Sequence, residues 1–185
     1  MSEHVIEGHR IGVLFSEAEI AERIGQLARS IAACKPRKLL VVPVLKGSFV
    51  FAADLIRAMH HAGLSPEVDF MILSSYRSGT RSSGHVQVLR DIESPVEGRD
   101  ILLVDDILES GRTIAFAKDL LTARGASKVH TAVLLNKPGH LAANIAADFQ
   151  CFECPDKFVV GYGMDMAHQF RELPYVGHVL GPASE

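Results

Sequence analysis

The amino-acid sequence predicts an α/β protein with a mostly parallel central sheet and helices on both of its faces. Short apolar segments rich in β-branched residues alternate along the chain with helical segments of ten or more residues. Residues 38–45 (KLLVVPVL) are apolar after the first position, which indicates a strand buried on both faces. Such alternation favours parallel strands joined by crossover helices.

The helices are expected from their start and stop signals. Ser16, followed three residues later by Glu19, forms a capping box that opens a helix running to about residue 33. A second helix is predicted over residues 49–61 and a third over residues 113–124, each followed within two residues by a glycine. The buried stripe expected on the second helix comprises Phe49, Ala52, Ala53 and Ile56.

The strands are expected where β-branched or aromatic residues lie between turn signals. In chain order they cover residues 10–15, 38–45, 67–74, 85–90, 101–104, 128–135, 149–152, 158–160 and 176–180. The strand at residues 101–104 should end at two adjacent acids, Asp105 and Asp106. Because ligands bind beyond the carboxyl ends of such strands, the segments that follow them are the candidates for a site.

Composition excludes several classes of protein. The chain has 185 residues, 48% of them hydrophobic, with 19 basic and 22 acidic side chains and a net charge of −3. This balance excludes a disordered chain and argues against nucleic acid as a partner. No apolar run approaches the roughly 20 residues that cross a bilayer, and the first residues lack a signal core. Three cysteines suit a reducing compartment. We expect one cytoplasmic domain over residues 1–185, without a membrane partner.

The most informative segment follows the strand at residues 101–104. Two acids are followed by a turn of small and polar residues that leads into the third helix. Hydroxyls, a permissive glycine and free N–H groups at a helix start are typical of a phosphate site. The acids can accept hydrogen bonds from sugar hydroxyls or support Mg²⁺. An ordinary capped helix is the alternative, and the paired acids before E-S-G-R-T favour the anion site.

This segment, VDDILESGRT at residues 104–113, resembles the 5-phosphoribosyl-1-pyrophosphate (PRPP) signature of the type I phosphoribosyltransferases. Further motifs narrow the resemblance to the hypoxanthine-guanine phosphoribosyltransferase family. They are VLKG at residues 44–47, Ser75-Tyr76 with the Ser/Gly/Arg stretch after it, LLNK at 134–137, PDKFVVGYGMD at 155–165 and FREL at 170–173. The resemblance implies the type I phosphoribosyltransferase fold. It also implies a small hood subdomain, built mainly from about residues 150–185 with an N-terminal contribution.

The resemblance implies a set of PRPP contacts. Asp105 and Asp106 would hold the ribose 2′- and 3′-hydroxyls and support Mg²⁺ through them or through water. Lys46 and Gly47 would bind pyrophosphate after a cis peptide bond, together with Arg171. The ribose and 5′-phosphate set comprises Asp105, Asp106, Ile107, Leu108, Ser110, Gly111, Arg112 and Thr113.

The resemblance also implies how a purine is bound. Phe158 would stack on the base, Lys137 would donate to its 6-oxo group, and Val159 would contact its edge through the backbone. Asp165 would line the base site and bind a Mg²⁺ chelated by pyrophosphate. Glu109 stands where the family usually has the aspartate credited with purine N7, so the carboxylate is retained on a longer side chain. Glu109 and Lys137 are the implied catalytic residues.

The implied activity is Mg²⁺-dependent transfer of the phosphoribosyl group from PRPP to N9 of hypoxanthine or guanine. The products would be IMP or GMP and pyrophosphate, a step of purine salvage. A lid beginning at Ser75 and Tyr76 and ending at residue 84 would exclude water. Two alternatives stay open: a xanthine- or guanine-preferring transferase, and a nucleotide-sensing RNA-binding regulator on the same fold. The family also implies a homodimer or homotetramer.

Overall fold

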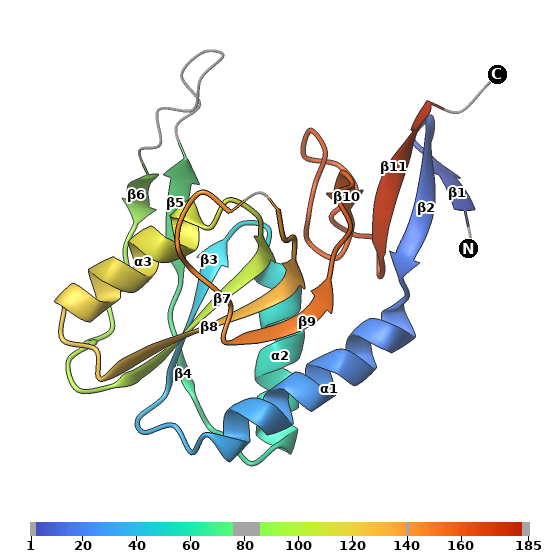
Figure 1. Cartoon of the computed structure of the whole chain (residues 1–185). Coiled ribbons are helices and arrows are strands. Elements are labelled where there is room, and N and C mark those ends of the chain that lie inside the picture. The colour runs from blue at the N-terminus through green and yellow to red at the C-terminus, as the bar shows by residue number, and fades with distance from the viewer. Residues whose placement is uncertain (1–2, 76–85, 140, 183–185) are drawn as a thin grey trace.

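The structure is a computed structural model of the chain, and it describes residues 3–75, 86–139 and 141–182 (Figure 1). Within these residues a seven-stranded sheet has the order β6-β5-β3-β7-β8-β9, with β4 paired to β3. All its pairings are parallel except that of β5 with β6. The predicted α/β architecture is confirmed. The strands are β3 (Leu40–Leu45), β4 (Glu67–Val68), β5 (Met71–Ser75), β6 (Val86–Arg90), β7 (Asp100–Leu108), β8 (Lys128–Asn136) and β9 (Phe149–Glu153).

Helices cover both faces of this sheet, as expected. Helices α1 (Glu17–Ala33) and α2 (Phe49–His61) lie on one face, and α3 (Arg112–Ala123) lies on the other (Figure 1). Alternate residues of the central strand β7 point to opposite faces. Leu102 packs in the cluster that contains α1 and α2, whereas Leu103 packs in the cluster that contains α3. Because this part of the strand is buried on both sides, the residues from Ile101 to Val104 are all apolar.

The capping box at the start of α1 forms as predicted. The backbone N–H of Ser16 donates to Glu19 Oε2 at 2.8 Å, and Glu19 N–H donates to Ser16 Oγ at 3.4 Å. The stripe expected on α2 is wrong in part, because Phe49 is 44% exposed and Ala53 is exposed. The buried residues of α2 are Phe51, Ala52, Leu55 and Met59. Residues 49–53 are all apolar, so periodicity alone does not select one face.

Two strand boundaries differ from expectation. The strand expected over residues 67–74 is split into β4 and β5, because Asp69 between them accepts N–H groups from Phe70, Glu93 and Ser94. Strand β7 does not end before the paired acids. It continues to Leu108, because β8 runs beside it as far as the pair Leu108–Asn136. The acids therefore lie within the ordered end of a strand.

A smaller antiparallel sheet lies beyond the carboxyl ends of the parallel strands (Figure 1). Its order is β1 (Glu3–Ile6), β2 (His9–Phe15), β11 (Val176–Pro182) and β10 (Val159–Val160). Its core comprises Ile11, Val160, Phe170 and Leu173. The expected hood boundary at about residue 150 falls within β9, so residues 150–153 belong to the larger sheet. None of the helices in the described part of the chain combines the length and apolar content needed to span a bilayer.

Candidate active site

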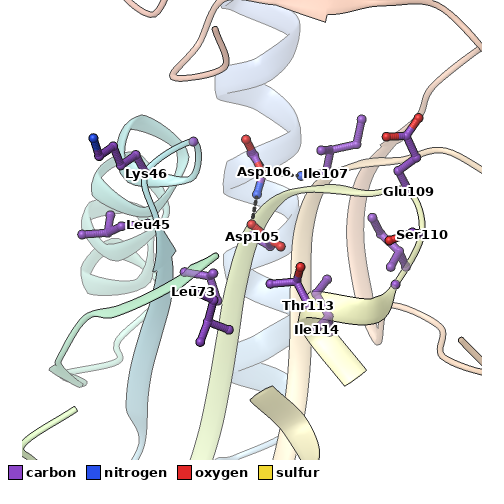
Figure 2. Close-up of a pocket in the computed structure, with 14 residues that line it drawn as sticks. Leu45, Lys46, Leu73, Asp105, Asp106, Ile107, Glu109, Ser110, Thr113 and Ile114 are labelled. Atoms are coloured by element: carbon purple, nitrogen blue, oxygen red, sulfur yellow. Dashed lines mark hydrogen bonds between the residues drawn. The ribbon is translucent and has the colours of Figure 1, made fainter. Parts of the chain in front are cut away.

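Two adjoining pockets lie where the parallel strands end. The first, here called the strand-end pocket, has a volume of about 290 Å³ and is formed by the loop after β3, the end of β7 and the start of α3 (Figure 2). The second, here called the base pocket, has a volume of about 200 Å³ and lies between β7, β8 and the small sheet. Asp106, Ile107 and Glu109 line both pockets. A ligand with two parts can therefore occupy both at once.

The start of α3 has the features of an anion site. Gly111, the N-cap, has φ of +74°, and a Cβ added there would lie 2.5 Å from Ile145 Cγ2, so glycine is needed for conformation and for space. The carbonyl of Ser110 accepts N–H groups from Ala142 and Ala143 at 2.9 and 3.2 Å, which fixes the loop. Ser110 and Thr113 line the strand-end pocket beside the positive end of the helix dipole.

The two acids form the floor of the strand-end pocket. Asp106 N–H donates to Asp105 Oδ1 at 3.0 Å, and Ile107 N–H donates to Asp106 Oδ1 at 2.9 Å (Figure 2). Burial and the neighbouring charge of Asp106 raise the pKa of the Asp105 carboxyl well above its usual range. Burial also raises the pKa of Asp106, and hydrogen bonds with Asp105 and with the backbone N–H of Ile107, followed by the positive charge of Arg171, partly offset this. The pair therefore favours a ligand that brings hydroxyl donors or a cation.

The loop after β3 approaches the acids closely. The Leu45–Lys46 peptide bond is cis, as the resemblance implied. A Cβ on Gly47 would overlap Asp106 Oδ2 and lie 2.7 Å from Asp106 Cγ. A Cβ on Gly163 would in turn overlap the Gly47 carbonyl oxygen. The ammonium end of Lys46 is exposed and extends away from Asp106 in Figure 2, so this loop presents mainly its backbone to the pocket.

Asp165 and Arg171 are joined in one ion pair. Arg171 Nη2 lies 2.6 Å from Asp165 Oδ1, and Arg171 Nη1 donates to the Gly163 carbonyl at 2.6 Å. Asp165 Oδ2 accepts the backbone N–H of His168 at 2.8 Å. Asp165 lines the base pocket, whereas Arg171 lines a separate groove of about 830 Å³ beside α1 and α2. Asp165 therefore lines the base pocket, whereas Arg171, expected to contact pyrophosphate together with Lys46 and Gly47, does not line the strand-end pocket that those two residues line.

The base pocket brings together the residues expected to bind a purine. Lys137, Phe158, Val159 and Asp165 all line it. Lys137 is only 8% exposed, and its Nζ lies 2.8 Å from Glu109 Oε1. The Glu109 hydrogen bond is the main factor that raises the pKa of Lys137. Phe158 is 58% exposed at the other wall. In Figure 2 the carboxyl group of Glu109 points away from Ser110 and Thr113.

Comparison with known proteins assigns the family. The chain matches the phosphoribosyl transferase domain family over residues 15–167. Hypoxanthine-guanine phosphoribosyltransferase of Dictyostelium discoideum is 40% identical over 169 residues, 90% of this chain and 94% of that protein. The enzyme of the same name from Bacillus subtilis is 44% identical over 184 residues, 99% of this chain and 98% of that protein. The chain belongs to the hypoxanthine-guanine phosphoribosyltransferase family.

A solved structure agrees with this family assignment. The crystal structure of a hypoxanthine phosphoribosyltransferase from Staphylococcus aureus has a TM-score of 0.85 at 38% identity and covers 90% of both chains. The predicted type I phosphoribosyltransferase fold is confirmed, and the chain is an enzyme of this hypoxanthine-guanine phosphoribosyltransferase family. The roles of individual residues stay predictions.

The other residues predicted for the site lie in different places in the structure. Ser75 is the last residue of β5, whereas Tyr76 and the rest of the expected lid lie outside the described residues. Arg112 lies in the first turn of α3 and is not among the residues that line the strand-end pocket. Sequence reasoning missed Asp156 and Lys157 beside the base pocket. Their signal was their position immediately before Phe158 in the D-K-F motif.

Three aspartates near the two pockets have the donor atoms that Mg²⁺ prefers. Among the residues that the structure describes, no three His, Cys, Asp or Glu side chains gather into a complete metal site. Mg²⁺ prefers carboxylate oxygens and usually takes only one or two of them, with water and substrate phosphates completing its shell. Asp105, Asp106 and Asp165 are hard oxygen donors of this kind, so the donor set fits a metal bound together with a pyrophosphate.

Proposed function

We propose that this enzyme carries out purine salvage by transferring the 5-phosphoribosyl group of PRPP to N9 of hypoxanthine or guanine. The products are IMP or GMP and pyrophosphate, and the reaction requires Mg²⁺. The observation that carries the proposal is the pairing of Lys137 with Glu109 at 2.8 Å, in a pocket that adjoins the phosphate-binding start of α3. This pocket offers one donor and one acceptor next to an exposed aromatic ring, Phe158.

The pair matches one edge of a 6-oxopurine. O6 is an acceptor and the neighbouring N7 carries a proton in one tautomer, so the base needs an adjacent donor and acceptor. Lys137 has only donors, and an ionised Glu109 has only acceptors. Phe158 supplies a ring face for stacking, and Val159 lies beside it on β10. Hypoxanthine and guanine both present this edge.

The strand-end pocket suits the sugar phosphate. The N–H groups and hydroxyls from Ser110 to Thr113 bind the 5′-phosphate, and the paired acids accept hydrogen bonds from the ribose hydroxyls. The backbone of Gly47 faces the pyrophosphate side, and Arg171 adds positive charge behind Asp165. These contacts direct the anomeric carbon of the ribose toward the base pocket.

The chemistry follows from where charge develops. As the bond from the anomeric carbon to pyrophosphate loosens, the ribose gains positive charge, and the carboxylates of Asp105 and Asp106 stabilise it. N9 of the base forms the new bond, and Glu109 accepts the N7 proton through its hydrogen bond. Mg²⁺ supplies positive charge to the pyrophosphate when bound. The side chain of Lys137 holds O6 and so keeps N9 aimed at the ribose.

The proposal also covers the cellular location and the oligomeric state of the enzyme. The three cysteines have free thiols, which suits the cytoplasm, and membership of the family supports a homodimer or homotetramer. The curated relatives compared above are named for hypoxanthine and guanine. Neither name refers to xanthine or to RNA, so nothing favours the xanthine-preferring or RNA-binding alternative.

The test is direct turnover. The protein is incubated with PRPP, Mg²⁺ and each of hypoxanthine, guanine and xanthine, and the nucleotide product is measured by chromatography. We expect IMP and GMP to form and excess EDTA to abolish turnover. Asp106→Ala should lower the rate about 100-fold or more, whereas Asp119→Ala, which removes an exposed acid of α3, should not. The absence of IMP, or full activity in EDTA, would refute the proposal.

A further inference from the structure

Lys137 forms ion pairs with two carboxylates that come from different segments of the chain. Its Nζ lies 2.8 Å from Glu109 Oε1 and 3.1 Å from Asp156 Oδ1. Glu109 follows β7, and Asp156 lies in the turn between β9 and β10. The lysine itself is buried, whereas the side chain of Glu109 is 48% exposed and that of Asp156 is 69% exposed. A buried ammonium is thus stabilised by two acids nearer the solvent.

The proposed reaction uses only one of these acids directly. When a purine enters, Glu109 serves N7 and Lys137 serves O6, so the Glu109 carboxylate is shared between the base and the ammonium. An ammonium group in a dry pocket is costly without a partner. Lys137 has three N–H donors, so it can keep its carboxylate partners while it donates to O6. Asp156 is the partner that the base does not engage.

The backbone fixes Asp156 close to Lys137. The N–H of Cys154 donates to the carbonyl of Asn136 at 2.7 Å, which ties the start of the turn to the residue before Lys137. The N–H of Lys157 donates to the Pro155 carbonyl at 2.7 Å and closes the turn around Asp156. Phe158 follows directly. Asp156 therefore lies between Lys137 and Phe158, two residues that line the base pocket.

We propose that Asp156 is a positioning residue for base recognition, which holds the Lys137 ammonium in line with purine O6 while Glu109 turns to N7. The inference rests on the proposed function of the base pocket. Asp156 acts through Lys137 and does not contact the base, so its loss should weaken binding of the base and leave binding of PRPP unchanged.

The first measurement compares Michaelis constants. In Asp156→Asn the side chain keeps its size and loses its charge, and we expect KM for hypoxanthine to rise about fivefold, the upper range for a partly exposed ion pair. KM for PRPP and the melting temperature should stay at the parent values. Asp156→Glu restores a carboxylate and should recover part of the loss. The matched control is Glu153→Gln, an exposed acid three residues away on β9, which should behave like the parent.

A double-mutant cycle with Lys137→Met separates positioning from a general effect of charge. If Asp156 acts through Lys137, adding Asp156→Asn to Lys137→Met should change KM for hypoxanthine by less than about 1.5-fold. An unchanged KM in the Asp156→Asn single variant would overturn the inference, and so would a full fivefold effect in the Lys137→Met background. Either result leaves the proposed function standing if the parent makes IMP. A parent that makes no IMP refutes the proposed function and this inference together.

Discussion

Replacing Gly47 by alanine tests whether the position of Asp106 controls the reaction. The new Cβ would overlap Asp106 Oδ2 and lie 2.7 Å from Asp106 Cγ, whereas carbon atoms in contact are about 3.5 Å apart. The carboxyl group must therefore move by roughly 1 Å. Its Oδ1 is also held by the N–H of Ile107 at 2.9 Å, so the movement breaks or bends that hydrogen bond.

The size of the effect follows from this displacement. A misplacement of about 1 Å in a group that orients a substrate can cost about 100-fold in rate, equivalent to about 2.7 kcal/mol of transition-state stabilisation. We expect kcat/KM for PRPP in Gly47→Ala to fall by about this factor. The protein should remain folded, because the clash involves one side chain at the edge of a pocket and not the packed core.

The assay measures initial rates of IMP formation at varied PRPP, with thermal unfolding monitored for each variant. Gly25→Ala is the matched control, because a Cβ at this position of α1 meets only Arg29 Nη1, at 3.6 Å. It should keep the parent activity and gain slight stability, since alanine favours helix. A folded Gly47→Ala enzyme within twofold of the parent would refute the importance of the Asp106 position.

Three further predictions concern titratable groups. Glu109→Gln removes the base and should lower kcat by about 10-fold or more, whereas Glu109→Asp should stay active; equal kcat for Gln and the parent would make Glu109 structural. The raised pKa of Asp105 means that its contribution to stability falls as pH rises above the ordinary aspartate range. Asp105→Asn should therefore raise Tm near pH 7 but not near pH 3, and a lower Tm at both would contradict this. Burial raises the pKa of Cys151 to about 12, so iodoacetamide at neutral pH should label exposed Cys34 first, as mass spectrometry can check.

Much of the fold was predictable because its sequence signals are local or depend only on which residues are apolar and which are polar. The apolar strands, the capping box at Ser16 and the bounds of α2 each depend on a few neighbouring residues. The face of α2 was not predictable, because apolar residues at all of positions 49–53 leave the choice to tertiary packing. Strand β1 was missed as well. It forms a hairpin with β2 through a turn in which Glu7 and Gly8 both have positive φ, and a Glu-Gly pair is a weak turn signal.

In the site too, residues within one motif were predictable and contacts formed by folding were not. The residues of the strand-end pocket follow one another in sequence, so a single motif predicted most of them. Asp156 reaches Lys137 from a separate segment, and no local pattern indicates this contact or the pairing of Arg171 with Asp165 within one loop. The continuation of β7 through Asp105 and Asp106 likewise depends on its pairing with β8. A sequence therefore predicts which residues form a site more readily than it predicts how they pair.

Whether Lys137 and Glu109 select the base is decided by the ratio of kcat/KM for hypoxanthine to that for adenine. Lys137 and Glu109 together present a donor to position 6 and an acceptor to N7. Adenine carries an amino donor at position 6, so donors would face donors and the hydrogen bond from Lys137 to position 6 would be lost. Sites built around such a hydrogen bond can reject an analogue by about 10⁴-fold. We expect a ratio of about this size in the parent and a large fall in it for Lys137→Ala. Comparable kcat/KM values for the two bases in the parent enzyme would show that Lys137 and Glu109 do not select the base.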